Sequence, residues 1–377
     1  MVNQGRLSTL RPATYRLSFF PLMSIDHKEK TALLRHLMGE RILVVDGAMG
    51  TTLQDANLEA DDFGGLNYEG CNENLVVTRP DLIEDVHLRF LDAGADIVET
   101  NSFGSTPLVL AEYDLADEAE SLSQRSAEIA RKAVDLVSTA EKPRFVAGSM
   151  GPTTKTISVT GGVTWEELAQ SFHVQARGLI RGGVDFLLIE TSQDTLNIKA
   201  ALEGIDRANA ELDSNAAVAV QGTVETMGTL LAGQDVETLY VSLEHRDLLW
   251  IGLNCATGPQ EMATHIGHLG RHCRKRISVL PNAGLPQLVN GESHYPLSPV
   301  ELADWHERFV KEDGVNVVGG CCGTVPEHIR EVADRVANLK PKTCHPQFTP
   351  ALTSLYSAVA LKQDADILAI GERTNAH

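Results

Sequence analysis

The sequence is poor in cysteine and in basic residues, and it has no apolar run long enough to cross a membrane. Its 51 acidic residues outnumber its 32 basic residues, and the resulting formal charge of −19 argues against polyanionic partners such as nucleic acid. Six cysteines spread over 377 residues do not form a disulfide framework. Since no secretory leader is present, they indicate a reducing cytoplasm and metal-binding or catalytic roles.

A strand-and-helix unit repeats along most of the chain. Eight short apolar runs alternate with stretches of helical periodicity, and 43% of the residues are hydrophobic, enough to fill a large core. Strands that alternate with helices predict a parallel sheet, and eight units predict a closed (β/α)8 TIM barrel, an α/β fold of one domain. The eight predicted strands are residues 42–46, 95–101, 145–150, 184–190, 217–223, 248–255, 277–282 and 315–321.

Helix start signals support the same architecture. A Ser or Thr followed three residues later by Glu is a capping box, and the pattern occurs at 164–167, 298–301 and 324–327. An open doubly wound sheet is the competing topology. The eight repeats and the lack of a dinucleotide-binding fingerprint favour the barrel.

The two ends of the chain differ from the repeating part. Residues 1–24 are predicted to be a disordered N-terminal extension, with Met23 as an alternative start. Three arginines among the first 22 residues (Arg6, Arg11 and Arg16), together with the lack of acids there, give a weak resemblance to a transit peptide. The barrel is predicted to span residues 25–340, and a C-terminal segment follows over residues 341–377.

Two adjacent cysteines flanked by glycines form the most distinctive motif, Gly319-Gly320-Cys321-Cys322-Gly323. The glycines let the backbone turn sharply enough for both sulfurs to face one point. With Cys255, which ends another strand, three thiolates predict a catalytic zinc site with an open fourth position. The alternatives are a vicinal disulfide, buried unreactive thiols or a phosphate-binding loop. The remaining cysteines are interpreted as incidental: Cys71, Cys273 and Cys344.

Polar side chains gather where the predicted strands end. Active sites of TIM barrels lie at the carboxyl ends of the strands, so these residues are candidates for chemistry. A single carboxylate at such a position is more often a helix cap or a loop hydrogen-bonding group. Several on the same rim as three cysteines favour a site instead. The residues are Asp46, Glu99, Glu190, Asn254 and Asn282.

These segments together resemble the homocysteine S-methyltransferase domain, from about residue 42 to residue 339. The resemblance rests on Asp46-Gly-Ala-Met-Gly-Thr51, Glu99-Thr-Asn101, Gly148-Ser-Met-Gly-Pro152, Asn254-Cys255 and the double-cysteine motif. It implies that Cys255, Cys321 and Cys322 bind zinc, in agreement with the interpretation of the motif itself.

The C-terminal tail narrows the resemblance. Residues 370–375, Ile-Gly-Glu-Arg-Thr-Asn, are similar to the opening strand of the pterin-binding barrel that follows this domain in cobalamin-dependent methionine synthases. Residues 341–377 are therefore expected to hold a linker and the start of a truncated pterin-binding domain. The resemblance is closest to the N-terminal homocysteine-binding module of those enzymes.

The resemblance also implies the chemistry. Coordination to zinc deprotonates a thiol, so bound homocysteine would attack a methyl group as a thiolate and yield methionine. The implied donor is methylcobalamin on a cobalamin-binding module of the same longer chain, which methyltetrahydrofolate on the pterin module would remethylate. The 377-residue chain is expected to bind zinc and homocysteine but neither cobalamin nor folate permanently.

Recognition of the amino-acid part of homocysteine is assigned to the same rim. Asp46 and Glu190 are the candidates for the ammonium group, because a charge-assisted hydrogen bond is strong between apolar walls. The carboxylate is assigned to the backbone amides of Gly47, Ala48 and Met49, with Glu99 and Ser149 as weaker substrate-binding candidates. The amide oxygen of Asn282 is a candidate for the fourth zinc ligand before substrate binds; the alternative is that Asn282 is a turn residue.

Three alternatives remain from the sequence. The first is a stand-alone homocysteine S-methyltransferase that uses S-methylmethionine or betaine. The second is a metal-free phosphate-binding or aldolase-type TIM barrel, although none of the eight predicted strands ends in the lysine that a Schiff base needs. The third is a docking module in which zinc only stabilises the barrel.

Overall fold

The computed structural model describes residues 26–289, 292–342, 346, 349–354 and 356–362. Two predictions, the extension at residues 1–24 and the pterin-domain strand at 370–375, lie outside the described residues. Among the residues described, no helix has both the length and the apolar composition that a membrane crossing requires.

Eight parallel strands form one sheet in the order β1-β10-β7-β6-β5-β4-β3-β2. A parallel bridge between Val45 and Ile97 joins the first strand to the second and closes the ring. This arrangement confirms the predicted (β/α)8 barrel. The strands are β1 (Leu43–Val44), β2 (Ile97–Glu99), β3 (Phe145–Met150), β4 (Phe186–Ser192), β5 (Ala217–Gly222), β6 (Leu248–Asn254), β7 (Arg276–Leu280) and β10 (Val317–Val318).

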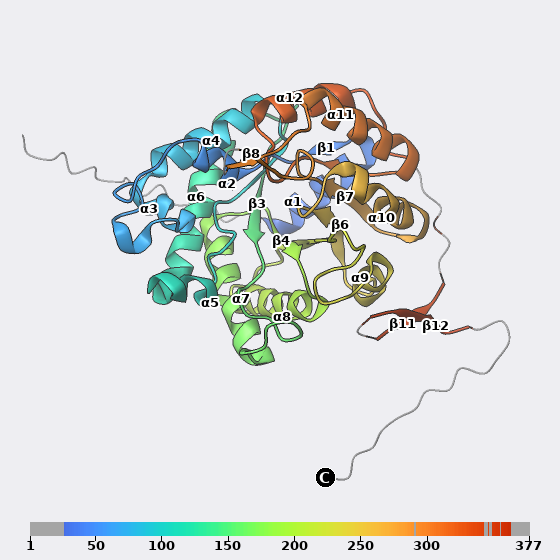
Figure 1. Cartoon of the computed structure of the whole chain (residues 1–377), viewed down its shortest axis with the longest axis horizontal. Coiled ribbons are helices and arrows are strands. Elements are labelled where there is room, and N and C mark those ends of the chain that lie inside the picture. The colour runs from blue at the N-terminus through green and yellow to red at the C-terminus, as the bar shows by residue number, and fades with distance from the viewer. Residues whose placement is uncertain (1–25, 290–291, 343–345, 347–348, 355, 363–377) are drawn as a thin grey trace, which may run out of the picture.

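Helices surround the strands, as Figure 1 shows. One outer helix follows each strand: α4 (Pro80–Asp92), α6 (Ala119–Val137), α7 (Trp165–Gly182), α8 (Thr195–Glu211), α9 (Val236–Leu243), α10 (Pro259–His272), α11 (Pro299–Arg308) and α12 (Pro326–Val336). Shorter helices lie in the loops: α2 (Met49–Gln54), α3 (Leu75–Thr78), α5 (Pro107–Leu110), the 3₁₀ turns Leu66–Tyr68, Asn72–Asn74, Ala111–Tyr113 and Ala116–Glu118, and the π-turn Phe309–Asp313.

An additional helix, α1 (His27–Glu40), packs against the interior of the barrel at the amino ends of the strands. We call this end of the barrel the base. Its buried Leu34 and Met38 belong to the same cluster as Phe145, Phe186 and Trp250. The rings of Phe186 and Trp250 meet edge to face with centroids 5.0 Å apart. The barrel is therefore a packed core and not a pore. The polar groups of the predicted site lie at its opposite end.

Two of the three predicted capping boxes are confirmed, at the starts of α7 and α11. The third was wrong. Helix α12 begins at Pro326, and its preceding Val325 N–H donates to His328 Nδ1 at 3.3 Å. The Thr324 hydroxyl instead donates to the Cys321 carbonyl oxygen at 2.6 Å. It therefore holds the cysteine loop and does not cap the helix.

Two hairpins were not predicted. Strands β8 (Gln287–Val289) and β9 (Glu292–His294) form one in the loop after β7. Strands β11 (Ala351–Thr353) and β12 (Ala358–Ala360) form the other inside the segment predicted to be a linker. There the Tyr356 carbonyl accepts a hydrogen bond from Thr238 Oγ1 of α9 at 3.2 Å, so the hairpin is attached to the barrel wall (Figure 1).

Candidate metal and substrate site

The three cysteines predicted to bind zinc come from two strand ends. Cys255 follows β6, and its N–H donates to the Leu280 carbonyl oxygen at 3.2 Å. The adjacent cysteines follow β10, where Cys321 N–H donates to Pro281 O and Cys322 O accepts from Ala283 N–H, both at 2.9 Å. The loop after β7 thus lies between the two strand ends and fixes both by backbone hydrogen bonds.

The sulfur atoms converge as the sequence predicts. All three Sγ atoms lie within 4.8 Å of one another, and Cys255 Sγ is 3.7 Å from Cys322 Sγ. Two sulfurs bound to one tetrahedral zinc at about 2.3 Å would be about 3.8 Å apart. The donor set and this spacing fit a zinc ion with three cysteine ligands and one further position.

Glycine is required directly before the cysteine pair. A Cβ on Gly319 would lie 2.8 Å from the Val45 carbonyl oxygen, and one on Gly320 would lie 2.3 Å from Thr324 Oγ1. His306, which is fully buried in α11, donates from Nε2 to the Gly319 carbonyl oxygen at 2.8 Å. Burial lowers the pKa of His306 to about 4, so the ring is a neutral donor at neutral pH.

The backbone at Cys255 is itself unusual. Cys255 and Ala256 have φ angles of +60° and +55°, in the left-handed region that non-glycine residues seldom adopt. Each such residue costs about 1–2 kcal/mol. Strain of this kind persists where the surrounding structure holds a functional group in place. Here it turns the Cys255 side chain toward the double-cysteine loop.

The thiols influence one another's ionisation. Hydrogen bonds from Cys255 and Cys321 lower the pKa of Cys322 to about 3. The same contacts raise the pKa of Cys321 well above its ordinary value. The cluster therefore holds one thiolate readily, and a cation is needed before all three cysteines can ionise together.

Three carboxyl groups lie beside the cluster, at the carboxyl ends of β1, β2 and β4. Asp46 and Glu190 are 2% and 4% exposed. Asp46 Oδ2 accepts a hydrogen bond from the Glu99 N–H at 3.1 Å, and Glu190 accepts one from the Ser149 hydroxyl. Two carboxyl oxygens, Asp46 Oδ1 and Glu99 Oε1, are buried without a hydrogen-bond partner among the described residues.

These acids are costly to ionise in the free protein. Burial, and for Asp46 and Glu99 also the nearby charge of Glu190, raises their pKa values well above the ordinary range. Burial raises the pKa of Glu190 to about 7. Two unpaired acceptors and three acids with raised pKa values form a site that a positively charged group would stabilise.

Asn254 connects the acids to the cysteines, a role that the sequence did not indicate. Its Nδ2 donates to Glu190 Oε2 at 3.2 Å and to Thr191 Oγ1 at 2.9 Å, and lies 3.9 Å from Cys321 Sγ. Thr191 has a φ of +52°, although β-branched residues seldom adopt that conformation. The strained backbone at Thr191, near the end of β4, is therefore positioned through Asn254.

Tyr295 is a second residue that sequence reasoning missed. Its ring packs on Gly323, where an added Cβ would lie 2.1 Å from Tyr295 Cγ. Burial together with the nearby Cys322 raises the pKa of Tyr295 to about 12. Tyr295 follows the β8–β9 hairpin, and no local sequence pattern relates that loop to the cysteines.

Only some of the backbone amides predicted to bind the substrate carboxylate are free to donate a hydrogen bond. Ala48 N–H already donates to Thr324, at 3.2 Å to the carbonyl oxygen and 3.3 Å to the hydroxyl. No hydrogen bond from the amides of Gly47 and Met49 occurs among the described residues. Ser149 is engaged in holding Glu190. The available groups for a substrate carboxylate are therefore the Gly47 and Met49 amides.

Asn282 and the other cysteines occupy different positions. Asn282 lies between Pro281 and Ala283, which hydrogen-bond to the cysteine pair, and its Oδ1 is buried without a partner among the described residues. An acceptor with no donor fits the predicted role as a metal ligand. Cys71 and Cys273 lie outside the cluster, and Cys344 is outside the described residues.

Comparison with known proteins identifies the architecture. The family model for homocysteine S-methyltransferase matches residues 43–336. The chain belongs to the homocysteine S-methyltransferase family. This match confirms the family predicted from the strand-end motifs and the prediction of a methyltransferase. It also argues against the alternative of an aldolase-type or phosphate-binding barrel.

Two curated methionine synthases are similar over almost the whole chain. Those of Mycobacterium leprae and Mycobacterium tuberculosis are each 46% identical, over 93% of this chain. The matched region is 29% of their own length, so the chain spans less than a third of these relatives.

Solved structures show the same fold. The homocysteine methyltransferase MmuM from Escherichia coli superposes in its metallated form with a TM-score of 0.65 at 23% identity, covering 80% of this chain and 99% of that one. Its oxidised form gives a TM-score of 0.63 at 24% identity, covering 78% and 96%.

Proposed function

We propose that this chain binds one zinc ion through Cys255, Cys321 and Cys322, and that it activates homocysteine for S-methylation to methionine. The observation that carries the proposal is the convergence of three free thiols to tetrahedral ligand spacing at the mouth of a homocysteine S-methyltransferase barrel. Three free thiols of this kind fit a reducing compartment such as the cytoplasm.

The thiolates set the chemistry of the site. Zinc supplies the positive charge that keeps the homocysteine sulfur deprotonated at neutral pH. Three cysteinate ligands leave the centre with a net negative charge, so electron density stays on the incoming sulfur and it remains a nucleophile. Asn282 Oδ1 is the proposed ligand before homocysteine binds, because this buried acceptor has no other partner among the described residues.

The acids orient the amino-acid part of homocysteine. Its ammonium group would donate to Asp46 Oδ1, Glu99 Oε1 and Glu190, the three carboxyl groups beside the cluster. Each donated hydrogen bond satisfies a buried acceptor and favours the ionised acid. The Gly47 and Met49 amides are the proposed partners of its carboxylate. This anchoring leaves the sulfur directed at the cysteines.

The methyl donor is proposed to be methylcobalamin carried by another module of a longer methionine synthase. The 46% identity to the mycobacterial methionine synthases, over 29% of their length, supports this assignment. A pterin-binding module of the same chain would supply methyl groups from methyltetrahydrofolate. A small donor such as S-methylmethionine or betaine is the alternative, and an assay of the chain with each donor separates them.

The decisive experiment measures proton release on homocysteine binding. If the sulfur binds as a thiolate, its proton must leave even at a pH below the ordinary thiol pKa of about 8.5. Calorimetry of the zinc-loaded chain near pH 7, in buffers of different ionisation enthalpy, should report close to one proton released for each homocysteine bound.

Homoserine is the matched control ligand, because it keeps the ammonium and the carboxylate and replaces the sulfur with oxygen. Homoserine should bind far more weakly and release almost no proton. Equal affinity for the two ligands, with no proton released for either, would mean that sulfur does not contact the metal. The zinc would then have only a structural role.

A further inference from the structure

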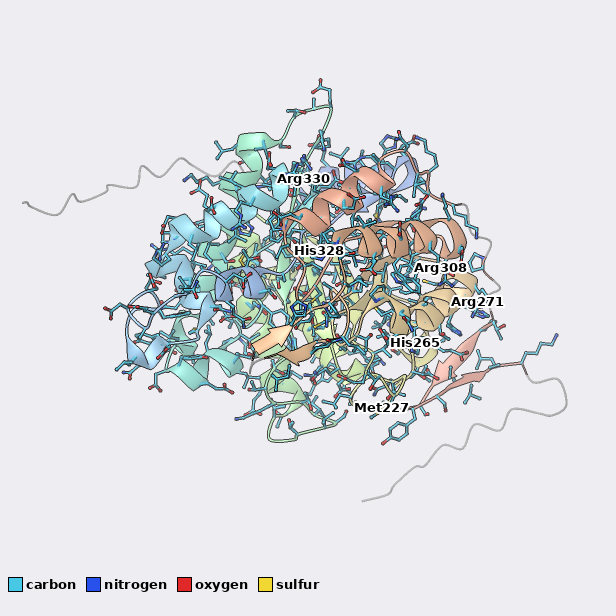
Figure 2. The ribbon with its side chains drawn as sticks, turned by 45° about the horizontal axis from the view of Figure 1, so that its top comes forward. Met227, His265, Arg271, Arg308, His328 and Arg330 are labelled. Carbon is cyan, nitrogen blue, oxygen red and sulfur yellow. The ribbon has the colours of Figure 1, made fainter. Side chains whose placement is uncertain are left out.

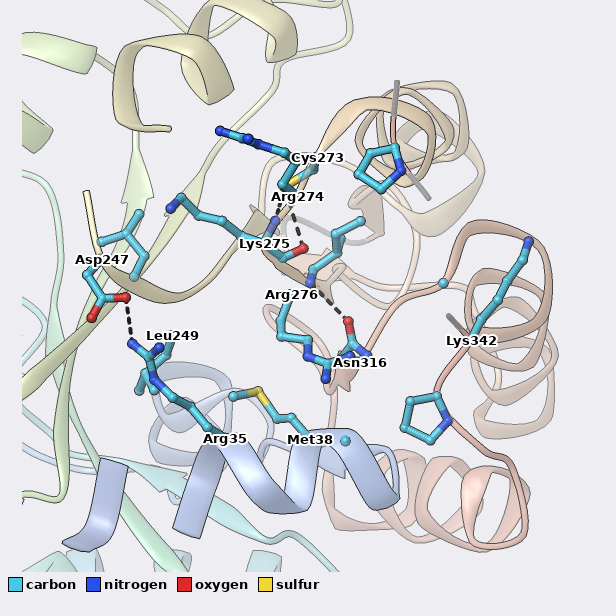
Figure 3. Close-up of a pocket in the computed structure, with 16 residues that line it drawn as sticks. Arg35, Met38, Asp247, Leu249, Cys273, Arg274, Lys275, Arg276, Asn316 and Lys342 are labelled. Carbon is cyan, nitrogen blue, oxygen red and sulfur yellow. Dashed lines mark hydrogen bonds and ion pairs between the residues drawn. The ribbon is translucent and has the colours of Figure 1, made fainter. Parts of the chain in front are cut away.

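A second cavity lies at the opposite end of the barrel from the cysteines. It has a volume of about 620 Å³ and lies between α1, the start of β7 and the chain just after α12 (Figure 3). That volume is in the range of small-molecule sites, about 300–1,000 Å³. Nothing in the homocysteine chemistry uses this cavity.

Positive charge is concentrated there. Five basic residues line the cavity, against one acidic residue, Asp247, in a chain of net charge −19. The basic residues are Arg35, Arg274, Lys275, Arg276 and Lys342. The acidic composition of the whole chain makes so local an excess of cations unexpected.

Three of these cations have no carboxylate partner among the described residues. Lys275 Nζ donates to the Arg246 carbonyl oxygen at 2.5 Å, and Lys342 Nζ donates to the Glu312 carbonyl oxygen at 2.6 Å. Those acceptors are neutral, so neither ammonium group is in an ion pair, although the charge of Asp313 acts on Lys342 from a longer distance. The Arg276 guanidinium has neither an ion pair nor a hydrogen bond within the part of the chain that the structure describes.

Some basic residues elsewhere on the surface are paired with acids. Figure 2 labels Arg308 and Arg330 on the outer helices. Arg308 pairs with Glu312 at 2.9 Å and Arg330 with Asp92 at 2.8 Å. Arg276 does approach the C-terminal end of α1, where a Cβ on Gly39 would lie 3.6 Å from its guanidinium. The helix dipole there supplies only about half a negative charge. It therefore leaves most of the charge in the cavity unbalanced.

A buried amide adds a further donor. Asn316, 3% exposed, lines the cavity, and Figure 3 shows it with Arg276 among the lining residues. Its Oδ1 accepts from Ile277 N–H at 3.3 Å, which fixes the amide orientation. Nδ2 has no partner among the described residues. The cavity therefore offers donors and cations in excess over acceptors.

We propose that this basal cavity binds a small, multiply charged oxyanion, with two or more phosphate or carboxylate groups. A guanidinium forms paired hydrogen bonds with such groups, and ammonium groups add point charges. Lys275, Arg276 and Lys342 form the binding set. The site is separate from homocysteine binding, which takes place at the other end of the strands.

The test is calorimetric titration of the full zinc-loaded chain at constant ionic strength. Fructose 1,6-bisphosphate, inorganic phosphate and tricarballylate serve as probes, and zinc content is measured before and after each titration. We expect saturable 1:1 binding of the bisphosphate or of the tricarboxylate, and whichever binds more tightly assigns the phosphate or carboxylate class. No saturable binding of any probe would overturn the proposal.

Variants locate the site. Arg276→Gln and Lys342→Gln should each weaken binding at least tenfold. Arg125→Gln is the matched control, because Arg125 is exposed on α6 and has no ion pair among the described residues. Retained affinity in both cavity variants, or an equal loss in the control, would overturn the proposal. Homocysteine affinity should be unchanged in Arg276→Gln. A loss of oxyanion binding in this variant would then come from the basal cavity and would not depend on the proposed function.

Discussion

The two ends of the barrel carry opposite chemistry on one scaffold. At the mouth, one buried carboxyl oxygen of Asp46 and one of Glu99 have no donor in the described part of the chain, and three thiols converge. At the base, α1 packs on the apolar interior, and around it Arg276 and the Asn316 amide lack acceptors among the residues that the structure describes. The mouth is thus suited to two kinds of cation, a metal ion and an ammonium group. The base is suited to an anion.

The contrast follows from the direction of parallel strands. All eight carboxyl ends reach the same rim, so residues distant in sequence meet there. The base is sealed by large apolar residues, which contribute stability. We therefore expect changes at the mouth to alter binding and changes in the basal core to alter folding.

The largest effect should come from the cysteines. Cys255→Ser, Cys321→Ser and Cys322→Ser should each abolish activity and reduce zinc binding to below stoichiometric, because an open zinc site needs all three thiolates. Metal analysis and a methylation assay measure this. Cys71→Ser is the matched control, since Cys71 is buried outside the cluster and should keep both properties. A cysteine variant that retains zinc and activity would be removed from the ligand set.

Much of this mouth was predictable from the sequence. Strand-end motifs predicted which cysteines and carboxylates meet, because a parallel barrel brings every strand end to one rim. Asn254 belongs to one of these motifs, but its bridging role depends on the strained turn at Thr191. Tyr295 and His306 reach the cysteine loop from a hairpin and a helix. Such contacts depend on tertiary packing, which local patterns do not encode.

The error at Thr324 has the same cause. A Thr followed three residues later by Glu matches a capping box, but the tight turn after Cys322 presents the Cys321 carbonyl oxygen to the Thr324 hydroxyl. The hydroxyl oxygen accepts from the Ala48 N–H at 3.3 Å and not from an amide of α12, so the helix starts at Pro326 without this cap. The basal cavity was not predicted either, because its cations come from α1, the loop before β7, β7 itself and the segment after α12.

The next largest effect should be a loss of stability caused by a substitution in the core at the base. Phe186→Ala removes a fully buried ring that packs on Trp250, and a loss of this kind costs about 3–5 kcal/mol of stability. Denaturant unfolding measures the free energy. Zinc stoichiometry of the folded protein should not change. Loss of zinc at full stability would show that the two ends are not independent.

Substrate affinity should respond to Glu190. Glu190→Gln keeps the shape of the side chain and removes its charge, so homocysteine should bind about 1.5–3 kcal/mol more weakly. Zinc binding should be unchanged, because Glu190 is not a proposed ligand. Calorimetry gives both quantities. A variant that loses zinc but keeps its affinity for homocysteine would show that the roles of acids and thiols are assigned wrongly.

The smallest effect concerns pH. The pKa of Glu190 is about 7 in the folded protein, above its ordinary value of 4.5. Between these values the folded state holds a proton that the unfolded state has lost, so stability should fall as pH rises through this window. The slope from one such group is about 1 kcal/mol per pH unit. Urea unfolding of the reduced, metal-free chain at pH 5, 6 and 7 measures it.

Glu190→Gln separates this acid from its neighbours. The variant should show a flatter dependence on pH and exceed the wild-type stability above pH 7, because a neutral amide has no charge to desolvate. Some slope should remain, since burial also raises the pKa values of Asp46 and Glu99. Homocysteine should reduce the slope in the zinc-loaded wild type by supplying an ammonium partner. Equal slopes in variant and wild type would mean that Glu190 ionises as freely in the barrel as in water, and the ammonium site would then have to lie elsewhere on the rim.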